Sequence, residues 1–93
     1  MQIVTSSGFE CEIKNNAFND YRVVKLISKI ESEDAADQLG AIVELMERIL
    51  PDGQEEALIA YLESKAEDGI ATVDMMGREL QDIMAQVTES KKN

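Results

Sequence analysis

The residues in this chain that could do chemistry are mostly carboxylates, and they are concentrated in its middle. Twelve Asp and Glu residues lie between Glu31 and Asp68, opposed only by Arg48 and Lys65, and this block holds the whole net charge of −10. Carboxylate catalysis needs two such groups in environments that separate their pKa values. Here the acids fall on the polar phases and first turns of helical patterns, which favours a solvated surface.

Other reactive groups lack the partners that would activate them. The chain has no His, the commonest general base and metal ligand, and its single Cys11 excludes an internal disulfide. The pattern around Cys11 predicts a small buried residue. The chain has no glycine-rich phosphate loop, no calcium loop and no Asp-Ser-Leu carrier-protein context. We therefore expect no enzyme activity, no cofactor, no metal and no small-molecule substrate.

The charge distribution also restricts the classes of partner. An acidic block argues against nucleic acid and against an anionic membrane, since both require a basic footprint. The main basic patch is Arg22, Lys25 and Lys29, at i, i+3 and i+7. It is a solvated face, a local partner for the acidic block of the same chain, or a self-association surface that meets the acidic block of a neighbouring copy. Without a signal peptide or an apolar run of about 20 residues, the chain is expected to be soluble and cytoplasmic.

Length and composition predict the elements that position these groups. A chain of 93 residues with 44% apolar residues predicts one domain with a thin core, for which self-association into a homo-oligomer is a common remedy. The expected fold is mainly α, a small four-helix domain with an N-terminal β-hairpin. The predicted parts are the hairpin (1–14), a helical bundle (17–90) and a polar tail (91–93).

The hairpin is predicted from turn chemistry and alternation. Ser6, Ser7 and Gly8 form a turn, and the segment 9–14 alternates with period two. Phe9, Cys11 and Ile13 are expected to face inward. An isolated two-stranded hairpin is marginal, so it must lie on the helices or pair with another strand.

Helical periodicity and capping residues predict the four helices. The first spans about 17–31, with Asn15 and Asn16 as its cap. The second is capped by Ser32 and ends at Pro51; the third is capped by Asp52 and runs to Lys65; the last is capped by Thr72 and spans 73–90. The expected apolar face of the first helix is Phe18, Tyr21, Val24, Ile27 and Ile30, with Val23 and Leu26 beside them. That of the second helix is Leu39, Ile42, Val43, Met46, Ile49 and Leu50. That of the third helix is Leu58, Tyr61 and Leu62.

The last helix is the predicted protein-binding element. Val73, Met76, Leu80, Ile83 and Val87 step by three and four residues, as in a short coiled-coil seam. This seam packs either inside the bundle or against another chain. Methionines suit an adaptable apolar surface. The candidate contact residues are Met75, Leu80, Ile83, Met84 and Val87.

The order of the motifs resembles that of a known family. The motifs are the strand Ser7-Gly8-Phe9-Glu10-Cys11-Glu12-Ile13, then Asn19-Asp20-Tyr21 before an apolar helix, an acidic helix ending at Ile49-Leu50-Pro51, a short helix with Leu58 and Leu62, Gly69 before Val73 to Met76, and a final helix with Glu79, Ile83 and a Lys-Lys end. Together they resemble the small tail assembly chaperones of long-tailed bacteriophages and prophages.

The resemblance implies a function as well as a fold. Such chaperones are not enzymes; they keep the long tape-measure protein soluble and help tail-tube proteins assemble around it, so those two proteins are the implied partners. Two alternatives remain open. One is an acidic regulator or inhibitor that occupies a basic protein site, with Glu44, Glu47, Glu55 and Glu56 as its contacts. The other is a structural subunit retained in the virus particle.

Overall fold

A computed structural model describes residues 1–31 and 34–91, and its element order confirms the predicted fold class. Two short strands form an antiparallel hairpin, and four helices follow it. The elements are β1 (Gln2–Val4), β2 (Glu10–Glu12), a 3-10 helix η1 (Ala17–Asn19), α1 (Tyr21–Ile30), α2 (Ala35–Ile49), α3 (Gln54–Lys65) and α4 (Val73–Lys91).

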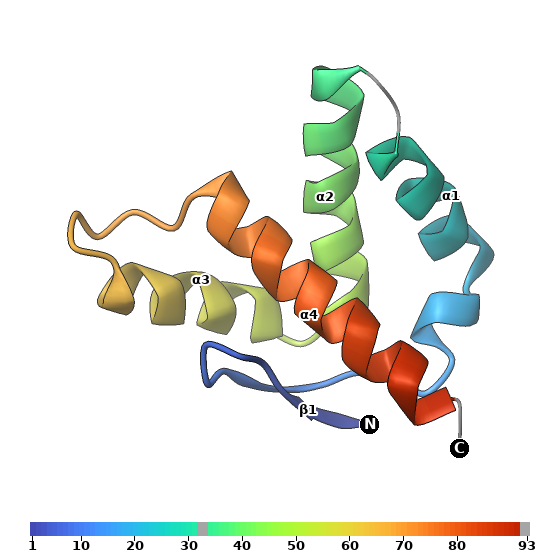
Figure 1. Ribbon diagram of the computed structural model, residues 1–93, viewed down its shortest axis with the longest axis horizontal. Coiled ribbons are helices and arrows are strands. Elements are labelled where there is room, and N and C mark those ends of the chain that lie inside the picture. Colours follow the sequence, from blue (N-terminus) through green and yellow to red (C-terminus); the bar gives the residue numbers. More distant parts are fainter. Residues whose placement is uncertain (32–33, 92–93) are drawn as a thin grey trace.

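The helices cross one another rather than forming a regular parallel bundle (Figure 1). α1 lies beside α2, α3 runs crosswise from the lower end of α2, and α4 passes diagonally over them. The hairpin lies beneath the junction of α2 and α3. One cluster of buried side chains joins all these elements, and its most deeply buried members include Ile13, Leu45, Leu58 and Ile83.

The hairpin follows the predicted alternation. Gln2 pairs with Glu12, Ile3 with Cys11, and Val4 with Glu10. Phe9, Cys11 and Ile13 are buried as expected, together with Ile3 and Thr5 on the same face. Burial raises the pKa of the Cys11 thiol, and the carboxylates of Glu79 and Glu12 raise it further. Cys11 is therefore a small residue of the core.

The start and the phase of the first helix differ from the prediction. Asp20 is the cap of α1 and accepts a hydrogen bond from the Arg22 amide at 2.9 Å, whereas Asn15 and Asn16 precede only the 3-10 turn. Val23 and Leu26 are buried, but Tyr21 and Val24 are 76% and 45% exposed. Steps of three residues drift around a helix with 3.6 residues per turn, so the predicted row leaves the core face.

The other helix starts give one confirmation and one correction. Thr72 caps α4 as predicted, because its hydroxyl oxygen accepts a hydrogen bond from the Met75 amide at 3.2 Å. Asp52 does not cap α3: Gly53 takes the cap position in a left-handed conformation, with a φ of +84°, and no side chain there accepts a capping hydrogen bond. Ser32 lies outside the described residues, and Asp34 caps α2. The last helix continues through Lys91.

Candidate protein-binding surface

Three of the five predicted contact residues lie in the core. Leu80, Ile83 and Val87 are buried, and Met75 and Met84 are half-buried against the same cluster. The sequence left open whether the seam packs inside the bundle or against another chain, and Leu80, Ile83 and Val87 pack inside it. These three positions pack inside the domain because α4 crosses α2 and the hairpin there, whereas Val73 and Met76 at the start of the seam are exposed and half-buried.

The polar face of α4 is also engaged within the chain, because it holds the hairpin turn. Glu79 is only 5% exposed, and its carboxylate accepts hydrogen bonds from the hydroxyls of Thr5 at 2.9 Å and Ser7 at 2.7 Å. Asp82 accepts a hydrogen bond from the Ser6 amide, which lowers the pKa of the Asp82 carboxyl. α4 is thus a structural helix over most of its length.

Side-chain amides occupy part of the hairpin's outer edges. Gln86 donates to the Val4 carbonyl at 2.9 Å on one edge. On the other edge, the Gln54 side chain accepts from the Glu12 amide at 2.5 Å and donates to the Glu12 carbonyl at 2.9 Å. Such edge groups would otherwise be a template for pairing with another strand. The hairpin edge is therefore a weaker candidate for docking than an exposed apolar surface.

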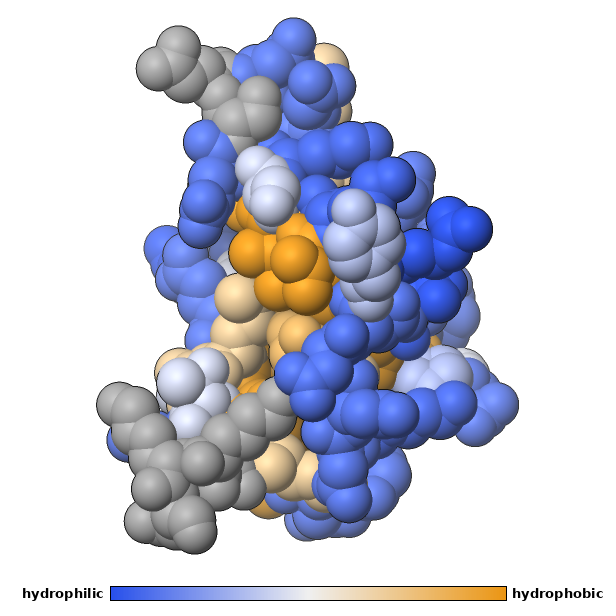
Figure 2. Space-filling model, turned by 90° about the vertical axis from the view of Figure 1, so that its right-hand side faces the viewer, coloured by the Kyte–Doolittle hydropathy of each residue, from blue (hydrophilic) through white to orange (hydrophobic). Residues whose placement is uncertain are grey.

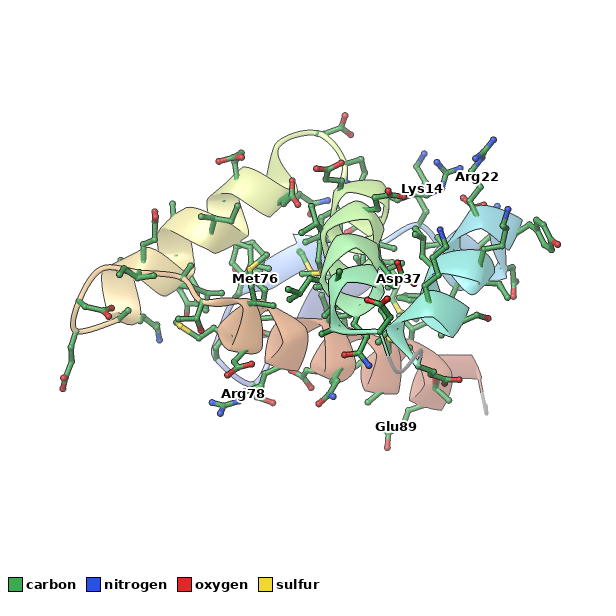
Figure 3. All side chains as sticks on the ribbon, turned by 90° about the horizontal axis from the view of Figure 1, so that it is seen from above. Lys14, Arg22, Asp37, Met76, Arg78 and Glu89 are labelled. Atoms are coloured by element: carbon green, nitrogen blue, oxygen red, sulfur yellow. The ribbon has the colours of Figure 1, made fainter. Side chains whose placement is uncertain are left out.

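The exposed apolar surface lies instead where α2, α3 and the start of α4 meet. We call it the α2–α4 groove and define it by the side chains of Leu39, Ile42, Val43, Ile59, Val73 and Met76. It consists of two adjoining hollows of about 450 and 220 Å³, which share Ile42 and Val73. Figure 3 shows Met76 pointing from α4 into the space between the helices, while Arg78 points away.

The groove exists because α2 has two apolar faces. Ala41, Leu45 and Ile49 are buried against the rest of the chain. Leu39, Ile42, Val43 and Met46 recur at i, i+3, i+4 and i+7 on a second face, along which Leu39 and Val43 are exposed. The sequence analysis assigned this row, with Ile49 and Leu50, to the core. Met46, Ile49 and Leu50 are buried as predicted, whereas Leu39 and Val43 are not. The signal it missed was that Ala41 and Leu45 supply a second, competing apolar face.

Carboxylates border the apolar floor of the groove. Glu55 lines it from the first turn of α3, and partial burial raises the pKa of this carboxyl, with smaller contributions from Glu47 and Glu56 nearby. Asp74 and Arg78 stand at the other end. A raised pKa means that the Glu55 negative charge is unfavourable where it stands, so a positive group from a partner would stabilise it.

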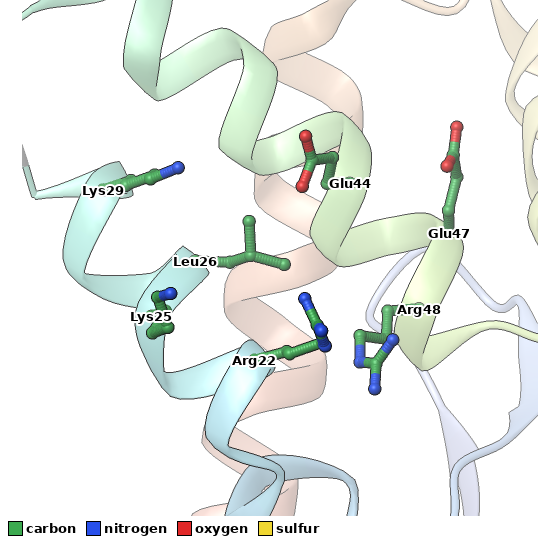
Figure 4. Close-up of a pocket in the computed structure, with 7 residues that line it drawn as sticks. All are labelled: Arg22, Lys25, Leu26, Lys29, Glu44, Glu47 and Arg48. Carbon is green, nitrogen blue, oxygen red and sulfur yellow. The ribbon is translucent and has the colours of Figure 1, made fainter.

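The predicted self-association strip lies on the far side of α2. Arg22, Lys25 and Lys29 of α1 line an open charged cleft of about 620 Å³, whose other wall carries Glu44, Glu47 and Arg48 of α2 (Figure 4). Among the described residues, the ion pairs are Arg48 with Asp20, at 2.7 Å, and the chain's amino terminus with Glu12, at 3.1 Å. The three cations of the strip are therefore not bound to the acidic wall that faces them.

Further searches of the chain yielded no match. No family model, curated protein or solved structure matches it. Within residues 1–31 and 34–91, no helix is long and apolar enough to cross a membrane, and no group of His, Cys, Asp and Glu residues could hold a metal ion. The α2–α4 groove is the candidate functional site that the geometry offers.

Proposed function

We propose that the protein is an assembly chaperone that binds an aggregation-prone helical client, and that this client is the tape-measure protein of a phage or prophage tail. The observation that carries the proposal is the α2–α4 groove, an apolar surface that the folded chain leaves open. The identity of the client follows from the family resemblance. In the same proposal, the bound chaperone helps tail-tube proteins assemble around the client.

The groove has the chemistry of a helix-binding site. Its walls are aliphatic and thioether side chains from three helices, and contiguous exposed apolar surface commonly marks a protein-binding site. An amphipathic helix would place anchors spaced i, i+3 and i+4 into the two hollows. Met76 can adjust to different anchors, because its side chain is flexible and polarisable. A client with many similar helical segments needs such tolerance.

The acidic charge suits the same role. The chain's net charge of −10 makes a complex with a long client repel its neighbours, which keeps it dispersed. Glu55 and Asp74 at the ends of the groove would also favour client segments with a basic residue beside the apolar anchors. Apolar contact and like charge together would hold the client soluble without chemistry on either chain.

Co-expression with a phage tape-measure protein tests the proposal. The soluble fraction of the client should rise with the unchanged chain and fall back with Val43→Asp, because the new charge would be buried under the bound helix. Val4→Asp is the matched control: Val4 is 50% exposed and Val43 53%, but Val4 lies on the hairpin. Circular dichroism checks that both variants fold. A client whose solubility is the same with and without the chaperone would refute the proposal.

The acidic-inhibitor hypothesis makes a different prediction in the same system. It expects binding to a basic protein that weakens steeply with salt and is lost when Glu44, Glu47, Glu55 and Glu56 become Gln. The chaperone proposal expects the quadruple variant to keep most client binding, since the apolar contacts remain. Retention of the chain in purified virus particles, detected by mass spectrometry, would instead favour a structural subunit.

A further inference from the structure

We infer that the α2–α4 groove is also the docking site for a second copy of this chain, which inserts the exposed face of its α1. The inference concerns the same groove as the proposed function but does not depend on the client. It rests on two apolar surfaces of the one chain, their charges and their positions.

The first surface is the part of the outer face of α1 that carries Tyr21 and Val24. Tyr21 and Val24 are exposed, and Ile27 beside them is only half-buried. Figure 2 views the molecule from the side on which α1 lies in Figure 1 and shows a hydrophobic patch in the middle of that face, bordered by hydrophilic surface. Val23 and Leu26, with Ile27 beside them, attach α1 to the core, so Tyr21 and Val24 are left available for another contact.

The charges around the two surfaces are complementary. On α1, Arg22, Lys25 and Lys29 form the row next to Tyr21 and Val24, and the Lys25 ammonium lies 6.0 Å from the centre of the Tyr21 ring. The groove is lined by two carboxylates, Glu55 and Asp74, and by one cation, Arg78. Two further carboxylates, Glu47 and Glu56, lie close to Glu55. Docking α1 would place cations beside carboxylates, which favours this partner over a neutral or acidic helix.

The dimensions of the two surfaces also match. α1 has 10 residues and is therefore about 15 Å long. The row of α2 that walls the groove runs from Leu39 to Met46, about 10 Å along the helix axis. The exposed face of α1 from Tyr21 to Ser28 covers a similar length. A single short helix can therefore span the groove.

The two surfaces lie on opposite sides of α2, so they cannot meet within one chain. In Figure 1, α3 and the start of α4 lie to the left of α2, and α1 lies to its right. A contact between α1 of one copy and the groove of the next joins two different surfaces. Contacts of this head-to-tail type extend into a ring or an open filament rather than closing as a simple dimer.

Self-docking would regulate access to the groove. A second copy in the groove covers Val43 and Val73, which prevents exposed apolar surface from collecting unrelated proteins. A client helix then has to displace α1 of the neighbouring copy. Free chaperone would be assembled and capped, and client-bound chaperone would be dispersed.

Sedimentation velocity of the purified chain over a range of concentrations tests the inference. The unchanged chain should associate beyond a dimer as concentration rises. Val24→Asp, which alters the inserting face, and Val43→Asp, which alters the groove, should each weaken association at least about tenfold, because each buries a charge in an apolar contact. A chain that stays monomeric throughout would overturn the inference.

Mixing the two variants distinguishes this contact from any other. Val24→Asp retains an intact groove and Val43→Asp retains an intact α1 face, so an equimolar mixture should form a one-to-one dimer that grows no further. A mixture that remains monomeric would overturn the head-to-tail contact.

Charge reversal supplies a second test that leaves the apolar residues unchanged. Lys25→Glu with Lys29→Glu should weaken association, and Glu55→Lys on the partner copies should restore it. Restoration requires the cations of α1 to stand next to Glu55. If association is not restored, the cations of α1 contact a surface other than the groove, and the proposed contact is wrong. Because only purified chain is used, each result can be judged whether or not a client is ever bound.

Discussion

At the scale of single residues, Glu79 is the side chain on which the packing of the hairpin most depends. Its carboxylate is buried and receives two hydroxyl hydrogen bonds from residues more than 70 positions earlier. We expect Glu79→Ala to lower the free energy of unfolding by about 2–3 kcal/mol, because the buried Thr5 hydroxyl loses this charged acceptor. Urea unfolding measures the change. Glu63→Ala on the exposed side of α3 is the control, and an equal loss in both variants would contradict this role.

Asp20 should give the stability of the fold its clearest dependence on pH. The hydrogen bond from Arg48 and then that from the Arg22 amide hold the pKa of this carboxyl below its ordinary value of 3.8. A carboxyl with a lowered folded-state pKa stabilises the fold above its unfolded pKa, and that stabilisation disappears as pH falls through the folded pKa. We expect Asp20→Asn to lower the melting temperature at neutral pH, with the difference disappearing in acid.

Asparagine isolates the charge in this experiment, because it still caps a helix well. Arg48→Gln removes the same ion pair from the other side and should reproduce the profile. A difference in melting temperature that does not vary with pH would mean that the ion pair contributes nothing.

At the scale of elements, the hairpin turn and the helices should respond oppositely to the same substitution. Gly8 has a φ of +96°, and a Cβ there would stand 2.8 Å from the Tyr61 hydroxyl. That hydroxyl donates to the Ser7 carbonyl, so it is not free to move away. We expect Gly8→Ala to destabilise the fold by about 1–3 kcal/mol, measured by thermal unfolding.

Gly40→Ala is the matched substitution inside a helix. Gly40 lies in α2, and a Cβ there would meet nothing within 4 Å. Alanine restricts the unfolded chain and favours the helix, so we expect a gain of about 0.5–1 kcal/mol. Effects of the same sign at both positions would contradict this account of the turn.

Most elements could be predicted from local sequence, but which face of each helix is buried could not. The alternation of Phe9, Cys11 and Ile13 and the cap at Thr72 depend on neighbouring residues only, and both were predicted correctly. Whether Leu39 and Val43 or Ala41 and Leu45 face the core depends on where α4 crosses α2. The pattern of α2 is compatible with both arrangements, so the groove could not be located from sequence.

At the scale of the whole molecule, uncompensated charge should make stability depend on salt. The net charge is −10, and the described residues form two ion pairs. Salt therefore screens more repulsion than attraction. Raising sodium chloride from about 10 to 150 mM should stabilise the fold by about 1 kcal/mol, hence roughly 4–8 °C in melting temperature. Calorimetry of the dilute chain measures this, and a falling melting temperature would show that attractive pairs dominate.

The attachment of the hairpin turn to α4 has a consequence for how the chain is made. Ser6 and Ser7 are made more than 70 residues before Glu79 and Asp82, which complete their hydrogen bonds. Until α4 emerges, the hairpin can be held by α3, through Gln54 and Tyr61, but the polar groups of its turn lack their carboxylate acceptors. The final docking of the hairpin turn must therefore wait for α4, and a ribosome that stops before α4 would release a chain in which the turn is not docked.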